Sequence, residues 1–308
     1  AIAAVKKYGS GCTGSRFLNG TLDLHLELEH RLAKFMKRDR ALVFSTGFQT
    51  NLGTISSLVW KGDTIVIDRQ VHACIVDGCR LSHGKTYKFA HNDMKDLERV
   101  LGVVRTLNPK GGILVIVDGV FSMEGDITKL PKLVEISKRF GARIMVDDAH
   151  SIGVLGATGA GTAEHFGLID EVDLTTGTFS KSFASLGGFV AGDDEVIDFI
   201  QHHARSLIFS ASIPPASAAS VLAALDIIES EPDRRDRLWK NARRIQKEFT
   251  ALGFDTCGSE TPIVPIVIGE DIEAFSFWKD LLDAGLFTNP VVSPAVPPGQ
   301  ALIRTSYT

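Results

Sequence analysis

Short apolar stretches, many of them rich in β-branched side chains, alternate along the chain with longer segments in which apolar and polar residues recur at helical spacing. This alternation is typical of βαβ units, in which helices connect the strands of a mostly parallel sheet. Strands are predicted at residues 41–44, 64–68, 86–89, 113–117, 143–146, 174–177 and 188–191. Helices are predicted at residues 25–37, 49–59, 72–81, 94–104, 129–140 and 195–203. The pattern therefore predicts an α/β fold.

The C-terminal part of the chain has a different pattern. An alanine-rich helix at 214–228 and a long charged helix at 233–252 precede strands at 263–268 and 302–306, a helix at 272–284 and a proline-rich loop at 289–299. We therefore predict a large domain over residues 1–235 and a small C-terminal α+β domain over residues 236–308. The first nine residues resemble a helix entering a loop, and residues 302–307 resemble a strand cut short, so we expect both domains to be incomplete.

Composition narrows the class of protein. Of the 308 residues, 44% are hydrophobic and 23% are charged, as in ordinary soluble globular proteins, and the net charge of -4 offers no basic field for nucleic acid. No apolar run approaches the roughly 20 residues of a membrane span, so we expect a cytoplasmic protein. The four cysteines, Cys12, Cys74, Cys79 and Cys257, form no CxxC pair and have no zinc-finger spacing, so we expect free thiols and no metal site.

The segment GTFSK (177–181) places Lys181 where a predicted strand ends, among small hydroxyl residues and shortly before the glycine pair at 187–188. A lysine that forms a Schiff base must be neutral to attack, and partial burial near a cationic group lowers its pKa enough for this. Lys181 is therefore a candidate nucleophile. The alternative is an ordinary surface lysine, because most lysines lie in exposed positions.

The segment DDAH (147–150) lies at the carboxyl end of another predicted strand, where ligands bind in open α/β sheets. An acidic side chain there can pair with a protonated pyridine nitrogen and make the ring an electron sink. His150 could donate a hydrogen bond to a phenolate oxygen. The alternatives are an aspartate that caps a helix and a histidine that is satisfied within the core.

The segment STGFQTN (45–51) follows a strand and opens a helix, so the backbone N–H groups of Gly47 and Phe48 could bind a phosphate. A glycine turn with a serine or threonine N-cap explains the same pattern. The spacing is not that of a P-loop, and no GxGxxG follows a predicted strand, which argues against a nucleotide-binding protein of the Rossmann type. A phosphate site, a pyridine partner and a lysine at one sheet edge together indicate pyridoxal 5'-phosphate (PLP).

From residue 9 to residue 308, the sequence resembles the α-oxoamine synthases, which are fold-type I PLP enzymes that condense an amino acid with an acyl-CoA and release carbon dioxide. The segments that carry the resemblance are GSGCTGSRFLNGTLDLHLELE (9–29), STGFQTN (45–51), HACIVDG (72–78), HNDM (91–94), DGVFSMEGD (118–126), VDDAHS (146–151), GTFSK (177–181) and FSASIPP (209–215). The resemblance implies a PLP-dependent transferase of fold type I, with a mostly parallel sheet in the large domain.

Three stretches are most similar to bacterial serine palmitoyltransferases: SRFLNGTLDLH (15–25), GTFSKSFASLGGFVAGD (177–193) and NPVVSPAVP (289–297). These enzymes of sphingolipid biosynthesis join L-serine to a long-chain acyl-CoA and form 3-ketodihydrosphingosine, CoA and carbon dioxide. The resemblance implies a homodimer with the active site at the interface, and it allows peripheral contact with a membrane. It implies no nucleic-acid partner.

The resemblance also implies roles for individual residues. Lys181 would hold PLP as an internal aldimine and transfer the proton at the substrate Cα, while His72 would stack on the pyridine ring. Asp147, rather than Asp148, would pair with the pyridine nitrogen, and His150 would bond the ring oxygen. These four catalytic residues are Lys181, His72, Asp147 and His150.

The remaining implied residues complete the cofactor and substrate sites. Ser122 and Thr178 would complete the cofactor site, and Arg304 would bind the substrate carboxylate. The phosphate would be bound by Gly47, Phe48 and Ser180, joined by Ser210 of the partner subunit. Two alternatives stay open: another α-oxoamine synthase, such as 8-amino-7-oxononanoate synthase or 2-amino-3-ketobutyrate CoA ligase, and a catalytically silent partner subunit.

Overall fold

The chain divides into two units in the computed structural model, which describes residues 1–307. Unit 1 comprises Ala1–Gly119 and Thr128–Ser230, and unit 2 comprises Val120–Ile127 and the chain from Glu231 onward. The division thus falls five residues before the predicted boundary at residue 235, and one distant loop joins the smaller unit. This loop belongs to unit 2 because the carbonyl of Gly125 accepts hydrogen bonds from the Thr261 hydroxyl and the Glu260 N–H.

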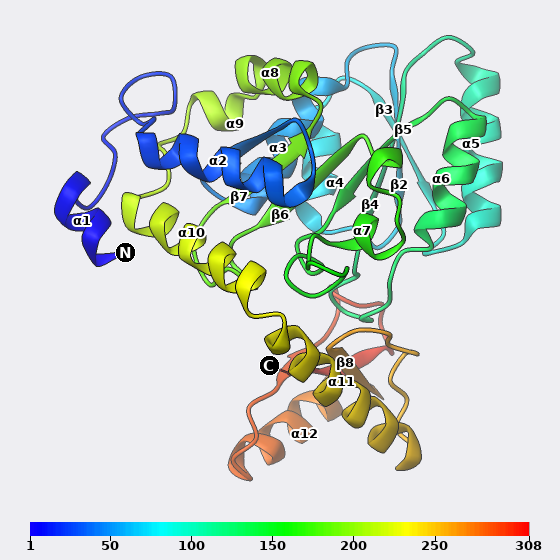
Figure 1. Cartoon of the computed structure of the whole chain (residues 1–308). Coiled ribbons are helices and arrows are strands. Elements are labelled where there is room, and N and C mark those ends of the chain that lie inside the picture. The colour runs from blue at the N-terminus through cyan, green and yellow to red at the C-terminus, as the bar shows by residue number, and fades with distance from the viewer. Residues whose placement is uncertain (308) are drawn as a thin grey trace. The chain divides into compact units, whose positions relative to one another are not determined.

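Seven strands form the sheet of unit 1, in the order β1-β7-β6-β5-β4-β2-β3 (Figure 1). Their bounds are β1 (Arg40–Phe44), β2 (Thr64–Asp68), β3 (Lys85–Phe89), β4 (Ile113–Asp118), β5 (Arg143–Asp147), β6 (Leu174–Thr178) and β7 (Gly188–Gly192). Of these seven strands, six run in one direction, and β7 runs antiparallel to both of its neighbours. Each of the seven predicted strands is confirmed to within one residue, and so is the mostly parallel α/β fold.

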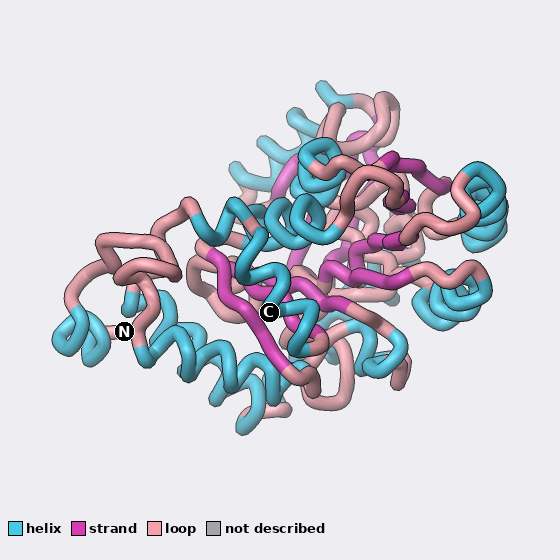
Figure 2. Tube along the Cα trace, turned by 90° about the horizontal axis from the view of Figure 1, so that it is seen from above, coloured by secondary structure: helices cyan, strands magenta, loops and turns pink. Residues whose placement is uncertain are grey.

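Helices cover both faces of this sheet (Figure 2). Strand β2 shows why: Ile65 and Ile67 pack into one core cluster with α3 and α4, whereas Val66 packs into another with α5 and α6. Strands buried on both faces read as continuous β-branched runs. The helices are α1 (Ile2–Tyr8), α2 (Asp23–Met36), α3 (Gly47–Leu58), α4 (Ala73–Leu81), α5 (Met94–Leu107), α6 (Leu130–Arg139), α7 (Thr162–His165), α8 (Asp194–His203), α9 (Arg205–Ile208) and α10 (Pro215–Ser230).

Strands β6 and β7 form a hairpin whose closing pair is Thr178 and Gly188. The connecting loop contains Lys181. Within the loop, the N–H of Phe179 donates to the Gly187 carbonyl at 2.9 Å, and the N–H of Ser185 donates to the Phe179 carbonyl at 2.8 Å. Gly187 has a φ of 126°, a conformation that side-chain-bearing residues rarely adopt, which explains the glycine there.

Unit 2 contains a three-stranded antiparallel sheet in the order β8-β10-β9. Its elements are α11 (Asp233–Ala251), β8 (Ile263–Gly269), α12 (Asp271–Asp283), β9 (Asn289–Val291) and β10 (Ala301–Ser306). Strand β9 lies where a proline-rich loop is predicted, so that prediction is wrong for these three residues. The strand tolerates Pro290 because it lies at the sheet edge, where a missing N–H costs no ladder hydrogen bond. No helix among residues 1–307 is long and apolar enough to cross a membrane.

Candidate active site

The carboxyl ends of six strands, β3 among them, meet at one edge of the unit 1 sheet. Strands β2, β4 and β5 end at Asp68, Asp118 and Asp147, and β6 ends at Thr178. Strand β1 runs in the same direction, since β7 is antiparallel to both β1 and β6. Ligands bind at this edge of open α/β sheets. The topology therefore gathers the segments 45–51, 147–150 and 177–181 at one edge.

Asp147 lies buried at the centre of this edge. Its Oδ2 accepts a hydrogen bond from Asn51 Nδ2 at 2.6 Å, and its Oδ1 accepts one from the Ala149 N–H at 3.0 Å. Burial raises the pKa of Asp147, and the two hydrogen bonds oppose this rise, as does the positive charge of Lys181. His72 follows β2, His150 follows β5 and Lys181 follows β6, so these residues lie at the same edge of the sheet as Asp147. The structure therefore places the four predicted catalytic residues at one edge of the sheet.

Lys181 is exposed in the loop between β6 and β7. The partial burial expected of this lysine is therefore wrong for the chain by itself. The reason is the orientation of the loop, which turns Phe179 and Phe183 into the core and leaves Lys181 on its outer side.

Asp148 is bonded differently from Asp147. Its two carboxylate oxygens accept hydrogen bonds from the Thr162 hydroxyl at 2.6 Å and from the Thr162 N–H at 3.0 Å. Burial raises the pKa of Asp148 to about 6. These bonds commit Asp148 to holding the start of α7, which leaves Asp147 as the carboxylate at the site. His150 lies half-buried in the turn that follows.

His72 caps the N-terminus of α4. Its ring Nδ1 accepts a hydrogen bond from the backbone N–H of Cys74 at 3.2 Å and lies 2.9 Å from the Cys74 sulfur. The backbone N–H of His72 donates to the Asp118 carboxylate at 3.2 Å. Because Nδ1 accepts, the neutral ring carries its hydrogen on Nε2. Burial raises the pKa of Asp118 well above its ordinary value, the charge of Asp147 raises it further, and the His72 N–H opposes the rise.

The start of α3 fits a phosphate group. The Thr46 hydroxyl accepts the Gln49 N–H at 3.1 Å, whereas the N–H groups of Gly47 and Phe48 have no partner within an α-helix. The hydroxyls of Thr178 and Ser180 lie 2.9 Å apart, and a Cβ atom on Gly47 would lie 2.8 Å from the Thr178 hydroxyl. A glycine thus lets two hydroxyls approach a helix N-terminus, which attracts anions.

Ser210 lies beside this phosphate site on the same chain, where its hydroxyl accepts a hydrogen bond from Gln49 Nε2 at 2.9 Å. Its role across a subunit interface stays a prediction. In unit 2, Arg304 Nε donates to the Ser122 carbonyl at 2.7 Å, and Arg304 Nη1 donates to the Ser306 hydroxyl at 3.2 Å. Burial lowers the pKa of Arg304. These contacts fix one edge of the guanidinium group within unit 2.

Four residues of the site received no role from the sequence: Asn51, Cys74, Asp118 and Thr176. Asn51 was part of the segment STGFQTN, and it lies four residues after Gly47, on the same face of α3. This helical spacing from Gly47 is the feature of the sequence that could have placed Asn51 in the site. Its partners Asp147 and Thr176 are 96 and 125 positions away, so their contacts left no local pattern.

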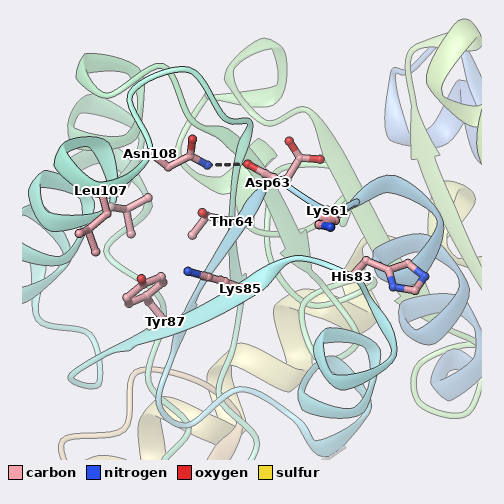
Figure 3. A pocket seen from close by; sticks show the side chains of 10 residues that line it. Lys61, Asp63, Thr64, His83, Lys85, Tyr87, Leu107 and Asn108 are labelled. Atoms are coloured by element: carbon pink, nitrogen blue, oxygen red, sulfur yellow. Dashed lines mark hydrogen bonds between the residues drawn. The ribbon is translucent and has the colours of Figure 1, made fainter.

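A separate cavity of about 300 Å³ lies near the amino ends of β2 and β3 (Figure 3). Its lining includes Lys61, Asp63, Lys85 and Tyr87, and Thr64 and Lys85 are the first residues of the two strands. The cavity contains none of the predicted site residues. It therefore lies at the opposite end of these strands from the candidate site.

A family model described as "Aminotransferase class I and II" matches residues 1–308. The chain is 54% identical over 303 residues to a serine palmitoyltransferase of Sphingobacterium spiritivorum, a match that covers 98% of this chain and 75% of that protein. It is 45% identical over 307 residues to an 8-amino-7-oxononanoate synthase of Symbiobacterium thermophilum, covering 100% of this chain and 78% of that protein.

Solved structures show the same likeness. A serine palmitoyltransferase of Sphingomonas wittichii superposes with a TM-score of 0.95 at 39% identity, covering 99% of this chain and 76% of that chain. A structure described as SPT with a PLP internal aldimine superposes with a TM-score of 0.96 at 38% identity, covering 99% and 77%. These chains are longer than this one and share its fold throughout the matched part.

Proposed function

The chain belongs to the aminotransferase class I and II family, and we propose that it is a PLP-dependent serine palmitoyltransferase of the α-oxoamine synthase type. The reaction forms a carbon–carbon bond between the Cα of L-serine and the thioester carbon of a long-chain acyl-CoA, with palmitoyl-CoA as the expected donor. The products are 3-ketodihydrosphingosine, CoA and carbon dioxide.

The observation that carries the proposal is the buried Asp147 carboxylate at the carboxyl edge of the sheet, where His72 follows β2 and Lys181 follows β6. A buried anion at the carboxyl edge of the sheet suits a protonated pyridine nitrogen, and the glycine-lined start of α3 suits the phosphate. The choice of serine and a long acyl chain is supported by the higher identity to a serine palmitoyltransferase than to an 8-amino-7-oxononanoate synthase.

Each residue contributes binding, orientation or proton transfer. When bound, PLP supplies an electron-withdrawing ring that stabilises negative charge at the substrate Cα. Asp147 holds the proton at the pyridine nitrogen, and His150 donates to the ring oxygen. Lys181 holds the cofactor and moves the proton at the substrate Cα, while His72 covers the ring and orients the substrate.

The remaining residues bind the two ends of the cofactor and the substrate. Gly47, Phe48 and Ser180 bind the phosphate, and Thr178 supports them. The planar guanidinium of Arg304, held by Ser122, binds the serine carboxylate through two parallel hydrogen bonds. In this proposal the enzyme is a homodimer, and Ser210 of the partner subunit completes the phosphate site.

A substrate panel tests the proposal. Purified protein supplied with PLP is offered serine, alanine and glycine, each with palmitoyl-CoA, pimeloyl-CoA and acetyl-CoA, and the products are identified by mass spectrometry. Serine with palmitoyl-CoA should be the fastest pair. Turnover of alanine with pimeloyl-CoA, without turnover of serine with palmitoyl-CoA, would instead identify an 8-amino-7-oxononanoate synthase. The 45% identity to such an enzyme makes it the main alternative.

A silent partner subunit is the alternative of a different class. The presence of Lys181, His72, Asp147 and His150 argues against it. In an active enzyme, PLP gives a visible absorbance band that borohydride abolishes. The reduced pyridoxyl group should then be found on the peptide that contains Lys181. A protein that takes up no PLP from solution would support the silent subunit.

We also propose that this cytoplasmic enzyme contacts membranes peripherally, because its acyl donor partitions into bilayers. Unit 2 offers exposed apolar side chains at Ile272, which is 83% exposed, and at Phe287, which is 80% exposed. Cosedimentation with phosphatidylcholine vesicles should fall for the double variant Ile272→Ser, Phe287→Ser. Equal amounts of both proteins in the supernatant, with no vesicle-bound fraction, would contradict this contact.

A further inference from the structure

Asn51 lies in the second turn of α3 and is buried, with 3% of its surface exposed. We propose that Asn51 is a positioning residue: its side-chain amide fixes the Asp147 carboxylate in one orientation and in its anionic form, as a pyridine-nitrogen partner requires. The same amide supports His72 through Cys74. This inference rests on the proposed function, because it assigns Asn51 to the same PLP site.

The orientation of the Asn51 amide follows from its partners. The Thr176 hydroxyl donates to Asn51 Oδ1 at 3.0 Å, and Thr176 is fully buried. The opposite amide orientation would place Oδ1 2.6 Å from an Asp147 carboxylate oxygen, with no hydrogen between the two acceptors. The Asp147 carboxylate, which only accepts, therefore selects the orientation in which the amide NH2 group faces it, and the Thr176 hydroxyl holds that orientation by donating to Oδ1.

The hydrogen bond from Asn51 offsets the cost of burying a charge. Burial favours the protonated form of Asp147, and the donors recorded on its two oxygens are Asn51 and the N–H of Ala149. Without the Asn51 donor, the pKa of Asp147 would rise further, and the carboxylate would be neutralised at a higher pH. The charged and titratable groups around it are His72 and Cys74 at the start of α4, Asp118 at the end of β4, Asp148 directly after β5, and Lys181 in the β6–β7 loop.

The second amide hydrogen of Asn51 extends the network to His72. Asn51 Nδ2 donates to the Cys74 sulfur at 3.2 Å, and the sulfur lies 2.9 Å from His72 Nδ1. Burial raises the pKa of Cys74, so the side chain is a thiol that can donate to His72. Each group in the chain from Thr176 through Asn51 and Cys74 to His72 thus donates to the next. One amide therefore orients two residues that face the cofactor.

The test measures cofactor binding rather than turnover alone. PLP is titrated into the apoprotein of wild type, Asn51→Ala, Asn51→Asp, Thr176→Val and Thr176→Ser, and the visible band is followed from pH 5 to pH 9. Asn51→Ala should weaken PLP binding about tenfold or more, since a hydrogen bond to a buried charge is lost. It should also shift the acidic side of the pH profile of PLP binding to higher pH. Asn51→Asp should have the larger effect, because two carboxylates would then face each other.

The Thr176 variants separate positioning from packing. Thr176→Val keeps the shape but removes the donor that holds Asn51 Oδ1, so it should shift PLP binding in the same direction by a smaller factor. Thr176→Ser keeps the donor and should restore wild-type binding. Thr54→Val is the matched control, because Thr54 is fully buried on the same helix and its hydroxyl has no partner among the described residues. It should leave the PLP band unchanged.

Two failures remain distinguishable. If wild type takes up no PLP, the proposed function fails, and the inference fails with it. If wild type binds PLP but Asn51→Ala and Thr176→Val match it in affinity and pH profile, the inference alone is overturned. A lower melting temperature in the Asn51 variants with an unchanged PLP band would also overturn it, since that result describes a purely structural residue. If Asn51→Ala does not fold, the two Thr176 variants decide.

Discussion

Lys181 projects from a loop whose inward-facing side chains are Phe179 and Phe183. Lys181→Ala should therefore abolish turnover and the borohydride-sensitive band while changing the melting temperature by less than about 2 °C, because surface substitutions have small effects on stability. The exposed Lys61, at the opposite end of the strands, provides the matched control. Lys61→Ala should retain full activity. Substantial turnover by Lys181→Ala would remove the lysine from the mechanism.

The neighbouring carboxylates Asp147 and Asp148 allow a second prediction, about pH. Burial raises the pKa of Asp148 to about 6, so between about pH 4 and 6 the folded state holds a proton that the unfolded state has lost. The contribution of Asp148 to stability is therefore greatest at low pH and decreases as the pH rises through this window. In Asp148→Asn, thermal melts at pH steps should show a weaker decrease than in wild type.

The same pair of variants should separate stability from activity. Asp148→Asn should keep the PLP band, because Asp148 bonds to Thr162 and not to the site. Asp147→Asn should retain some cofactor but lose most activity, since the pyridine nitrogen would no longer be held protonated. An Asp147→Asn enzyme with a near-wild-type rate would contradict the role given to this carboxylate.

At the scale of single elements, the start of α3 shows how closely the site is packed. A methyl group added at Gly47 would lie 2.8 Å from both Cβ and the hydroxyl of Thr178, which is shorter than any relaxed contact. Gly47→Ala should therefore weaken PLP binding about tenfold or more by moving the hydroxyls that face the phosphate. Isothermal titration of the apoprotein with PLP measures the change.

A glycine elsewhere in unit 1 provides the control for Gly47→Ala. Gly102 lies within α5, and a Cβ atom there would meet nothing within 4 Å. Gly102→Ala should leave PLP affinity unchanged and raise the unfolding free energy by about 0.5 to 1 kcal/mol, because alanine is the better helix former. Equal PLP affinity in both alanine variants would show that the phosphate binds elsewhere.

Hydrophobic pattern predicted the seven strands of unit 1 most directly where a strand is a buried β-branched run, as in β2 and β4. It did not predict the four-residue helices α7 and α9, which are too short to show periodicity. It did not predict β9, since three residues that include Pro290 carry no periodicity. Residue chemistry predicted Lys181, Asp147 and Gly47 because each ends a strand or starts a helix. It missed Asn51 and Asp118, whose importance depends on contacts between distant segments. The exposure of Lys181 agrees with the alternative of a surface lysine rather than with the partial burial expected of a Schiff-base lysine.

At the scale of the whole molecule, the predicted homodimer has a surface to form it. The isolated bridge between Ser15 and Ala211 brings two segments together, and these expose Leu18 (82%) and Phe209 (71%). Ser210 lies beside Phe209 and bonds to Gln49 at the phosphate site. Burying these apolar side chains against a second copy would thus place the partner next to the cofactor.

Light scattering during gel filtration tests this prediction. Wild type should have about twice the chain mass of 33.3 kDa, and the double variant Leu18→Asp, Phe209→Asp should be a monomer with much weaker PLP binding. Ile2→Asp is a suitable control, because Ile2 is exposed but lies outside these two segments. A dimeric double variant would place the interface on another surface.

The family resemblance inferred from the motifs is confirmed by the match over residues 1–308. Motifs such as GTFSK and VDDAH were sufficient for this because they combine reactive residues with the turns that hold them. The division into two units was only approximated, since the loop Val120–Ile127 joins unit 2 through contacts with residues more than 130 positions away.

The antiparallel hairpin of β6 and β7 has a consequence for how the lysine moves. Both ends of the loop 179–187 are anchored in the middle of the sheet by the pair Thr178 and Gly188. Hydrogen bonds from Phe179 to Gly187 and from Ser185 to Phe179 hold the main chain on both sides of Lys181. A lysine that would hold the cofactor and also move a proton at the substrate would be returned to the same position by a loop anchored in this way.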